Sequence, residues 1–102
     1  MQKEHILSYL ADIKVELVKN GIEKIGLFGS YAKDKADLFS DIDIAIKMKS
    51  SYLNEHDVWE YFNLIESIKK MLLTKFSRKV DVFDLDSTGD IKDTITKDII
   101  YV

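Results

Sequence analysis

The chain of 102 residues contains no cysteine and no proline, and only four glycines. The absence of cysteine excludes disulfide bonds and metal sites with thiolate ligands. No apolar run approaches the roughly 20 residues of a membrane-spanning helix, and the charged N-terminus lacks the apolar stretch of a signal peptide. The net charge of −3 is small and negative, unlike that of a general nucleic-acid binder. We therefore expect a cytoplasmic protein with no membrane partner.

Hydrophobic residues make up 46% of the chain, which is enough for one modest core. The sequence has no repeat, no low-complexity stretch and no flexible linker. At this length, we expect a single domain over residues 1–102.

Hydrophobic periodicity predicts four helices that alternate with three strands. The predicted helices cover residues 3–19, 30–35, 55–74 and 91–102, and the predicted strands cover residues 24–28, 41–48 and 80–85. Asn20-Gly21 is expected to end the first helix, Asn54 is expected to cap the third, and residues 47–53 read as a polar, mobile connection. The order α-β-α-β-α-β-α fits a small α+β domain with helices against a mixed sheet.

The most informative segment is GSYAKDKADLFSDID, residues 29–43. Gly29 and Ser30 follow a predicted strand, and the free N–H groups of such a turn can hold phosphate oxygens. Asp41 and Asp43 then alternate with isoleucines, so the strand places both carboxylates on one face. About 7 Å separates residues i and i+2 of a strand, and carboxylates at that spacing can share hard cations. The pattern suits the transfer of a nucleotide from a triphosphate.

A further carboxylate is available on the third predicted strand. Strand parity places Asp81 with Phe83 and Leu85 and places Asp84 on the other face, while Asp86 follows just beyond. Parity alone does not decide which face meets the metals.

Other polar and aromatic residues give weaker signals. Four basic residues could approach a triphosphate or a partner, although a solvated surface role is the commoner outcome for each: Lys33, Lys35, Arg78 and Lys79. His5 and His56 lack paired ligands and read as surface residues. Trp59 and Tyr61 flank the apolar stripe of the long helix, where core packing or a helix contact explains them.

The Gly-Ser turn followed by a two-aspartate strand resembles the signature of the polymerase β-like nucleotidyltransferase superfamily. The whole chain is similar in size and layout to the minimal nucleotidyltransferases that act as MntA-type antitoxins beside HEPN-domain toxins. One departure follows the turn, because family members often have a basic residue followed by glycine, and here Lys33 precedes Asp34. Aspartate tolerates positive φ better than most residues, so we expect the turn to persist.

The resemblance implies a polymerase β-like fold and assigns roles to particular residues. It selects Asp81, in the Lys-Val-Asp run, as the third carboxylate beside Asp41 and Asp43. These three would be the catalytic and metal-binding residues, with two Mg²⁺ ions, and the triphosphate of ATP would lie on Gly29, Ser30 and Lys33.

The resemblance also implies a reaction, the transfer of AMP from ATP to a tyrosine of a cognate HEPN toxin in a possible hetero-oligomer. Two alternatives stay open: neutralisation of the toxin by binding alone, and transfer to a small molecule or an RNA end. The intact Asp41 and Asp43 argue against the first, and the lack of a second domain and the negative charge argue against the second. The apolar end at residues 99–102 is a candidate partner surface or a part of the core.

Overall fold

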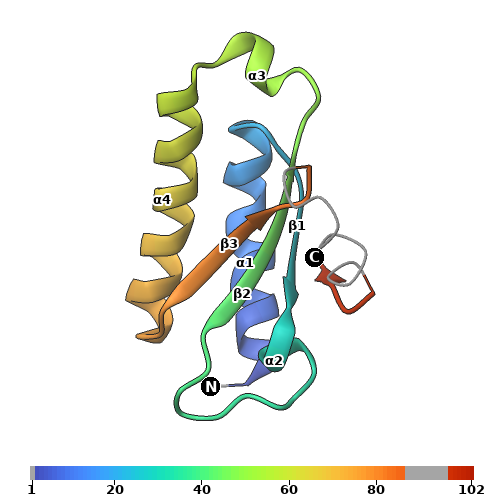
Figure 1. The fold of residues 1–102 in the computed structure, drawn as a ribbon, viewed down its shortest axis with the longest axis vertical. Helices are drawn as coiled ribbons and strands as arrows, with labels where there is room; N and C mark the ends of the chain where they lie inside the picture. The colour runs from blue at the N-terminus through green and yellow to red at the C-terminus, as the bar shows by residue number, and fades with distance from the viewer. Residues whose placement is uncertain (1, 87–96) are drawn as a thin grey trace.

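The computed structural model describes residues 2–86 and 97–102 (Figure 1). Its helices and strands are, in chain order, α1 (Lys3–Lys19), β1 (Ile22–Phe28), α2 (Gly29–Ala32), β2 (Ile42–Met48), α3 (Tyr52–Glu55), α4 (Val58–Phe76), β3 (Val80–Asp84) and β4 (Ile100–Tyr101). The strands form one sheet in the order β3-β2-β1-β4. β1 is antiparallel to β2 and to β4, whereas β2 is parallel to β3. The predicted α+β class with a mixed sheet is confirmed.

One face of the sheet carries the main core, against which α1 and α4 pack. In Figure 1, α1 lies behind the strands and α4 runs beside β3. The isoleucines of β2 are completely buried in this core together with residues of both helices: Ile42, Ile44, Ile46, Ile6, Leu10, Ile68 and Leu72. The predicted alternation along β2 is therefore confirmed, since its aspartate side chain at position 43 is only half-buried.

A smaller apolar cluster lies on the opposite face of the sheet. It consists of Phe28, Ala45 and Leu85, with Phe83 and Ile99 packed against it. The rings of Phe28 and Phe83 meet edge to face with their centroids 5.3 Å apart. The carboxylates of Asp43 and Asp81 lie on the same face and are therefore next to apolar side chains.

The first helix agrees with the prediction, and other element ends differ from it. Asn20 caps the C-terminus of α1, and Gly21 follows with a φ of 107°. The predicted N-cap at Asn54 is wrong, because Asn54 lies inside the short α3, which also takes in the last two residues of the expected mobile connection. The side chain of Asp57 caps α4 instead, by accepting a 2.9 Å hydrogen bond from the Glu60 N–H.

The predicted C-terminal helix is wrong at its end. Ile100–Tyr101 form β4, and β4 pairs with β1 through Gly26 and Leu27. A Cβ on Gly26 would lie 2.6 Å from Ile99 Cγ2 and 2.8 Å from the Ile100 carbonyl oxygen. The missing side chain of Gly26 thus lets the C-terminal segment reach the edge of β1. Residues 91–96 of the predicted helix lie outside the described residues.

Within residues 2–86 and 97–102, no helix combines the length and the apolar character needed to cross a membrane.

Candidate functional site

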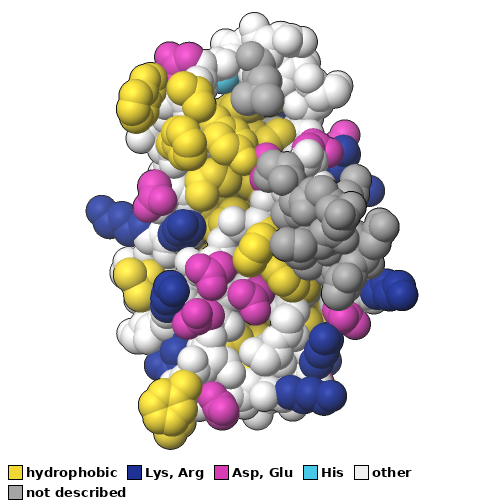
Figure 2. All heavy atoms as spheres, in the orientation of Figure 1, with side chains coloured by type: hydrophobic (Ala, Val, Ile, Leu, Met, Phe, Trp, Pro, Cys, Tyr) yellow, Lys and Arg dark blue, Asp and Glu magenta, His cyan; other side chains and the backbone are white. Residues whose placement is uncertain are grey.

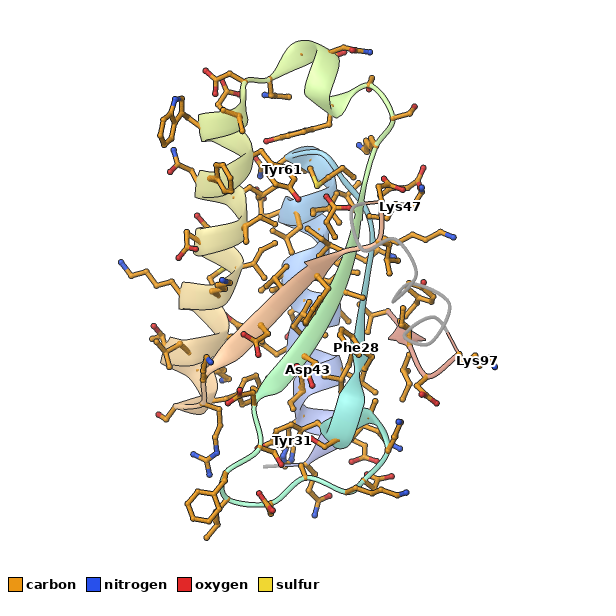
Figure 3. The ribbon with its side chains drawn as sticks, viewed as in Figure 1. Phe28, Tyr31, Asp43, Lys47, Tyr61 and Lys97 are labelled. Carbon is orange, nitrogen blue, oxygen red and sulfur yellow. The ribbon has the colours of Figure 1, made fainter. Side chains whose placement is uncertain are left out.

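The candidate site is centred on Asp43, on the sheet face that carries the smaller apolar cluster. Asp43 of β2 pairs with Phe28 of β1 on one side and with Asp81 of β3 on the other. Figure 3 shows Asp43 on the sheet beside Phe28, with Tyr31 nearer the end at which α2 lies. Neighbouring strands are about 4.8 Å apart, so the parallel register brings the carboxylates of Asp43 and Asp81 onto one face as neighbours.

The structure separates the two aspartates of β3 by their surroundings. Asp81 stands opposite Asp43, whereas Asp84 accepts a 2.5 Å hydrogen bond from the Tyr61 hydroxyl of α4. Burial and then the bond to Asp84 raise the pKa of Tyr61. Asp84 therefore ties α4 to β3, and Asp81 is the aspartate of β3 that lies beside Asp43.

Asp41 lies just before β2 and is partly exposed. Its carboxylate is 3.8 Å from the Lys79 ammonium group, at the outer limit of an ion pair. Lys79 stands just before β3, and the Lys79 carbonyl oxygen accepts a hydrogen bond from the Ile42 N–H. The residues just before β2 and β3 thus add one carboxylate, Asp41, and one cation that partly balances it, Lys79, to the edge of the site.

The charges of the site are poorly compensated. Burial, followed by the negative charges of Asp81 and Asp41, raises the pKa of Asp43 to about 6. A carboxyl group with a pKa so far above its ordinary value of 3.8 is held in a place that disfavours its ionised form. Perturbed titratable groups of this kind gather at functional sites.

Gly29 joins β1 to α2 directly beside Asp43. Its φ of 75° is one that side chains other than glycine rarely adopt. A Cβ at this position would lie 2.2 Å from Asp43 Oδ2 and 3.0 Å from Asp43 Cγ. The glycine is therefore needed both for the turn and for the close approach of the Asp43 carboxylate, and Ser30 follows it as the next residue of α2.

Lys33 ends α2, and its ammonium group is 3.2 Å from the carboxylate of Asp98. No local pattern predicts this ion pair, because the two residues are far apart in the chain. Asp34 has a φ of 59° and forms a 2.9 Å ion pair with Lys3. The turn after α2 therefore does persist with aspartate in place of glycine, and a lysine partly balances that charge.

The donor set suits a hard cation. Carboxylate oxygens are the ligands that Mg²⁺ prefers, and Mg²⁺ usually binds one or two carboxylates and completes its shell with water and phosphate oxygens. Over the described residues, no three His, Cys, Asp or Glu side chains are gathered closely enough to hold an ion by themselves. Asp41, Asp43 and Asp81 thus fit a site that a bound triphosphate would complete.

The apolar cluster beside the carboxylates was not predicted as part of the site. Phe28 of β1, Ala45 of β2 and Phe83 of β3 share the face of Asp43. A signal existed in the sequence, since strand parity places Phe83 with Asp81. The contribution of Ile99 could not be found, because the C-terminal strand was predicted as a helix.

Comparison with known proteins identifies the family of this chain. Residues 11–102 match the family model described as "Polymerase beta, Nucleotidyltransferase". A Methanocaldococcus jannaschii protein named "Putative protein adenylyltransferase" is 36% identical over 86 residues, which cover 82% of this chain and 80% of the relative. The "Protein adenylyltransferase MntA" of Thermococcus cleftensis is 30% identical over 102 residues, covering 97% of this chain and 94% of the relative.

Solved structures share the fold at lower sequence identity. A structure described as "Structure of putative minimal nucleotidyltransferase" has a TM-score of 0.72 at 17% identity, with 98% of this chain and 95% of that chain covered. A "toxin-antitoxin with AMP-PNP" crystal structure has a TM-score of 0.62 at 23% identity, with 99% and 72% covered. The family match over residues 11–102 and the identity to the Methanocaldococcus jannaschii and Thermococcus cleftensis relatives show that this chain is an enzyme of the polymerase β-like nucleotidyltransferase family.

Proposed function

We propose that this nucleotidyltransferase is a Mg²⁺-dependent protein adenylyltransferase, which transfers AMP from ATP to a tyrosine hydroxyl of a cognate HEPN-domain toxin. The observation that carries the proposal is the in-register pair of Asp43 and Asp81 against the Gly29 turn. Two relatives at 30% identity or more bear the name protein adenylyltransferase, one of them qualified as putative, which favours AMP and a protein acceptor. Residues 1–102 would act as one domain.

Each site residue has a role in this proposal. Asp41, Asp43 and Asp81 would hold the metal, and two Mg²⁺ ions would fit a group of three carboxylates that also shares phosphate oxygens. Gly29 and Ser30 would bind the phosphates through the turn, and Lys33 would bind them through its ammonium group. When bound, Mg²⁺ would neutralise phosphate charge and favour the ionised form of the acceptor hydroxyl.

The reaction is a substitution at the α-phosphorus of ATP. The tyrosine oxygen forms a bond to this phosphorus, the bond to the bridging oxygen of the β-phosphate breaks, and pyrophosphate leaves. Tyrosine has a pKa near 10 and is protonated at neutral pH, so its proton needs an acceptor. Asp81 would take that proton, because it neighbours Asp43 on the exposed face of the sheet.

The proposal that the acceptor is a toxin is supported by the descriptions of two structures that share the fold. Two structures that share the fold are described as toxin–antitoxin crystal structures, one of them with AMP-PNP. The candidate carboxylates are partly exposed, so a partner protein would have to supply the shape that orients the tyrosine. The protein encoded by the adjacent open reading frame is the acceptor to test, provided that it carries the Arg-x4-His motif expected of a HEPN toxin.

The test is to incubate the purified pair with ATP and Mg²⁺ and to measure the mass of the partner. We expect a gain of one or more AMP units, located on a tyrosine by peptide mass spectrometry. Asp41→Asn and Asp43→Asn should abolish the gain and should also remove metal-dependent ATP binding in calorimetry. Asp86→Asn, which changes an exposed aspartate that pairs with Lys47, is the matched control and should leave both intact.

A different result would assign a different function. If the wild type neutralises the toxin with no change in mass, and the Asp41→Asn/Asp43→Asn protein neutralises it equally well, the protein acts by binding alone. Unchanged ATP binding in both single variants would remove the metal site from the proposal.

A further inference from the structure

The first turns of α4 expose three large apolar side chains that lie on or beside the apolar stripe of the predicted long helix. Val58 is 55% exposed, Trp59 is 72% exposed and Phe62 is 53% exposed. Residues three and four apart are neighbours on a helix surface, so these three side chains gather on one side of α4. We call them the α4 apolar patch.

The patch is uncovered because it lies away from the helix face that packs against the sheet. Trp59 and Ile68 are nine residues apart, or two and a half turns at 3.6 residues per turn, so their side chains lie on opposite sides of α4. Ile68 and Leu72, in the second half of the helix, are completely buried. Removing Val58, Trp59 or Phe62 from water therefore requires another surface.

The patch lies on the same side of the molecule as the candidate site. Figure 2 shows hydrophobic side chains over the upper end of α4 and acidic side chains near the centre of the same face. From Phe62 to the end of α4, where the chain turns towards Asp81, is about 20 Å by the helical rise. An ordinary protein interface of about 800 Å² on each partner is wide enough to cover both.

The surroundings of the patch carry more acidic than basic side chains. Residues 50–68 contain four acidic residues and no lysine or arginine, and Lys69, which follows, lies 3.7 Å from Glu66. The four acidic residues are all exposed: Glu55, Asp57, Glu60 and Glu66. An isologous dimer through this surface would place the same four charges of one copy against those of the other, which is unfavourable.

We propose that the α4 apolar patch is the docking surface for the acceptor protein, which contributes an apolar strip flanked by basic side chains. This proposal rests on the proposed function, since it assigns the acceptor of that reaction. Contact with the patch anchors the acceptor at one end of α4 and lets its tyrosine reach Asp43 and Asp81 at the other. Trp59 is the expected main contact, because exposed tryptophans that become buried contribute most to binding.

The test measures binding of the adjacent-frame protein to this chain by calorimetry without nucleotide. We expect Trp59→Ala/Phe62→Ala to weaken the affinity at least tenfold. The matched control is Val15→Ala, which removes an apolar side chain that is 64% exposed on α1, and it should bind within twofold of the wild type. In the transfer assay, the patch variant should raise KM for the acceptor and leave kcat and the Kd of ATP unchanged.

A second measurement needs no substitution. Trp59 is the only tryptophan of the chain, so 5-fluorotryptophan places a single ¹⁹F reporter in the patch. Addition of the acceptor should shift or broaden this resonance.

A third measurement tests the charge of the acceptor: Glu66→Lys should slow association, most strongly at low salt.

The outcomes separate this proposal from the function on which it rests. Loss of binding in the patch variant without any transfer by the wild type keeps the docking surface and overturns adenylylation. Transfer with an unchanged KM in the patch variant, or an unperturbed ¹⁹F resonance, keeps adenylylation and overturns the docking surface. The docking surface is also overturned if the wild type does not bind the acceptor. The same holds if the only effect of the patch substitutions is to convert a dimer of this chain into monomers.

Discussion

Asp43→Asn removes a charge that the folded protein holds at a cost, and the variant should therefore be more stable than the wild type at neutral pH. The pKa of Asp43 is about 6 in the folded chain against an ordinary value of 3.8. A shift of about 2 units corresponds to about 3 kcal/mol at 1.36 kcal/mol per unit. Because the side chain is only partly buried, solvent screening reduces this to about 1–2 kcal/mol.

The sign of the effect sets its pH dependence. Below pH 3.8 the Asp43 carboxyl group is protonated in both the folded and the unfolded states, so ionisation costs nothing. As the pH rises from 3.8 to 6, the unfolded state loses the proton first, and the stability of the wild type falls relative to the variant. Above pH 6 the full difference of about 1–2 kcal/mol is present.

Urea denaturation of the wild type and Asp43→Asn at pH 3.5, 5 and 7.5 measures this difference. The pKa of Asp43 can also be followed by carboxyl ¹³C NMR. Asp81→Asn should lower that pKa more than Asp41→Asn does, because the charge of Asp81 is the larger of the two contributions. A stability difference that does not change with pH, or a pKa of Asp43 below 4, would refute the reasoning.

Three further predictions concern neighbouring contacts. Gly29→Ala should lower the free energy of unfolding by about 1–3 kcal/mol because the φ of this residue is positive, and it should abolish nucleotide transfer. In the Asp43→Ala background the same substitution should cost less, because the added Cβ then meets no carboxylate. Asp98→Asn should release Lys33 and lower the Kd of ATP severalfold in calorimetry, whereas an unchanged Kd would mean that Lys33 does not bind phosphate. Tyr61→Phe should lower the free energy of unfolding by about 1–2 kcal/mol, since it removes the hydrogen bond between α4 and β3. A change of less than about 0.5 kcal/mol, the low end for a hydrogen bond, would contradict this prediction.

Much of the fold could be predicted because the relevant signals are local. The 3.6-residue periodicity of residues 3–19 is sufficient to predict α1, and the period-two alternation around Asp43 is sufficient to predict β2 and the face of its carboxylate. The same local rules fail at the C-terminus, where Ile100 and Tyr101 suit either a helix or a strand. Their state depends on the free edge of β1 and on the space above Gly26, which lie more than 70 positions away.

By itself, the sequence determined the Gly29 turn, the strand with Asp41 and Asp43 on one side, and two possible faces for the aspartates of β3. Only the tertiary structure decided that Asp81 stands beside Asp43 and that Asp84 bonds to Tyr61. It also left Trp59 exposed, where the helical pattern allowed either core packing or a helix contact. The physical reason is the same in each case: backbone geometry sets which side chains share a face, but only packing against distant elements decides which face is covered.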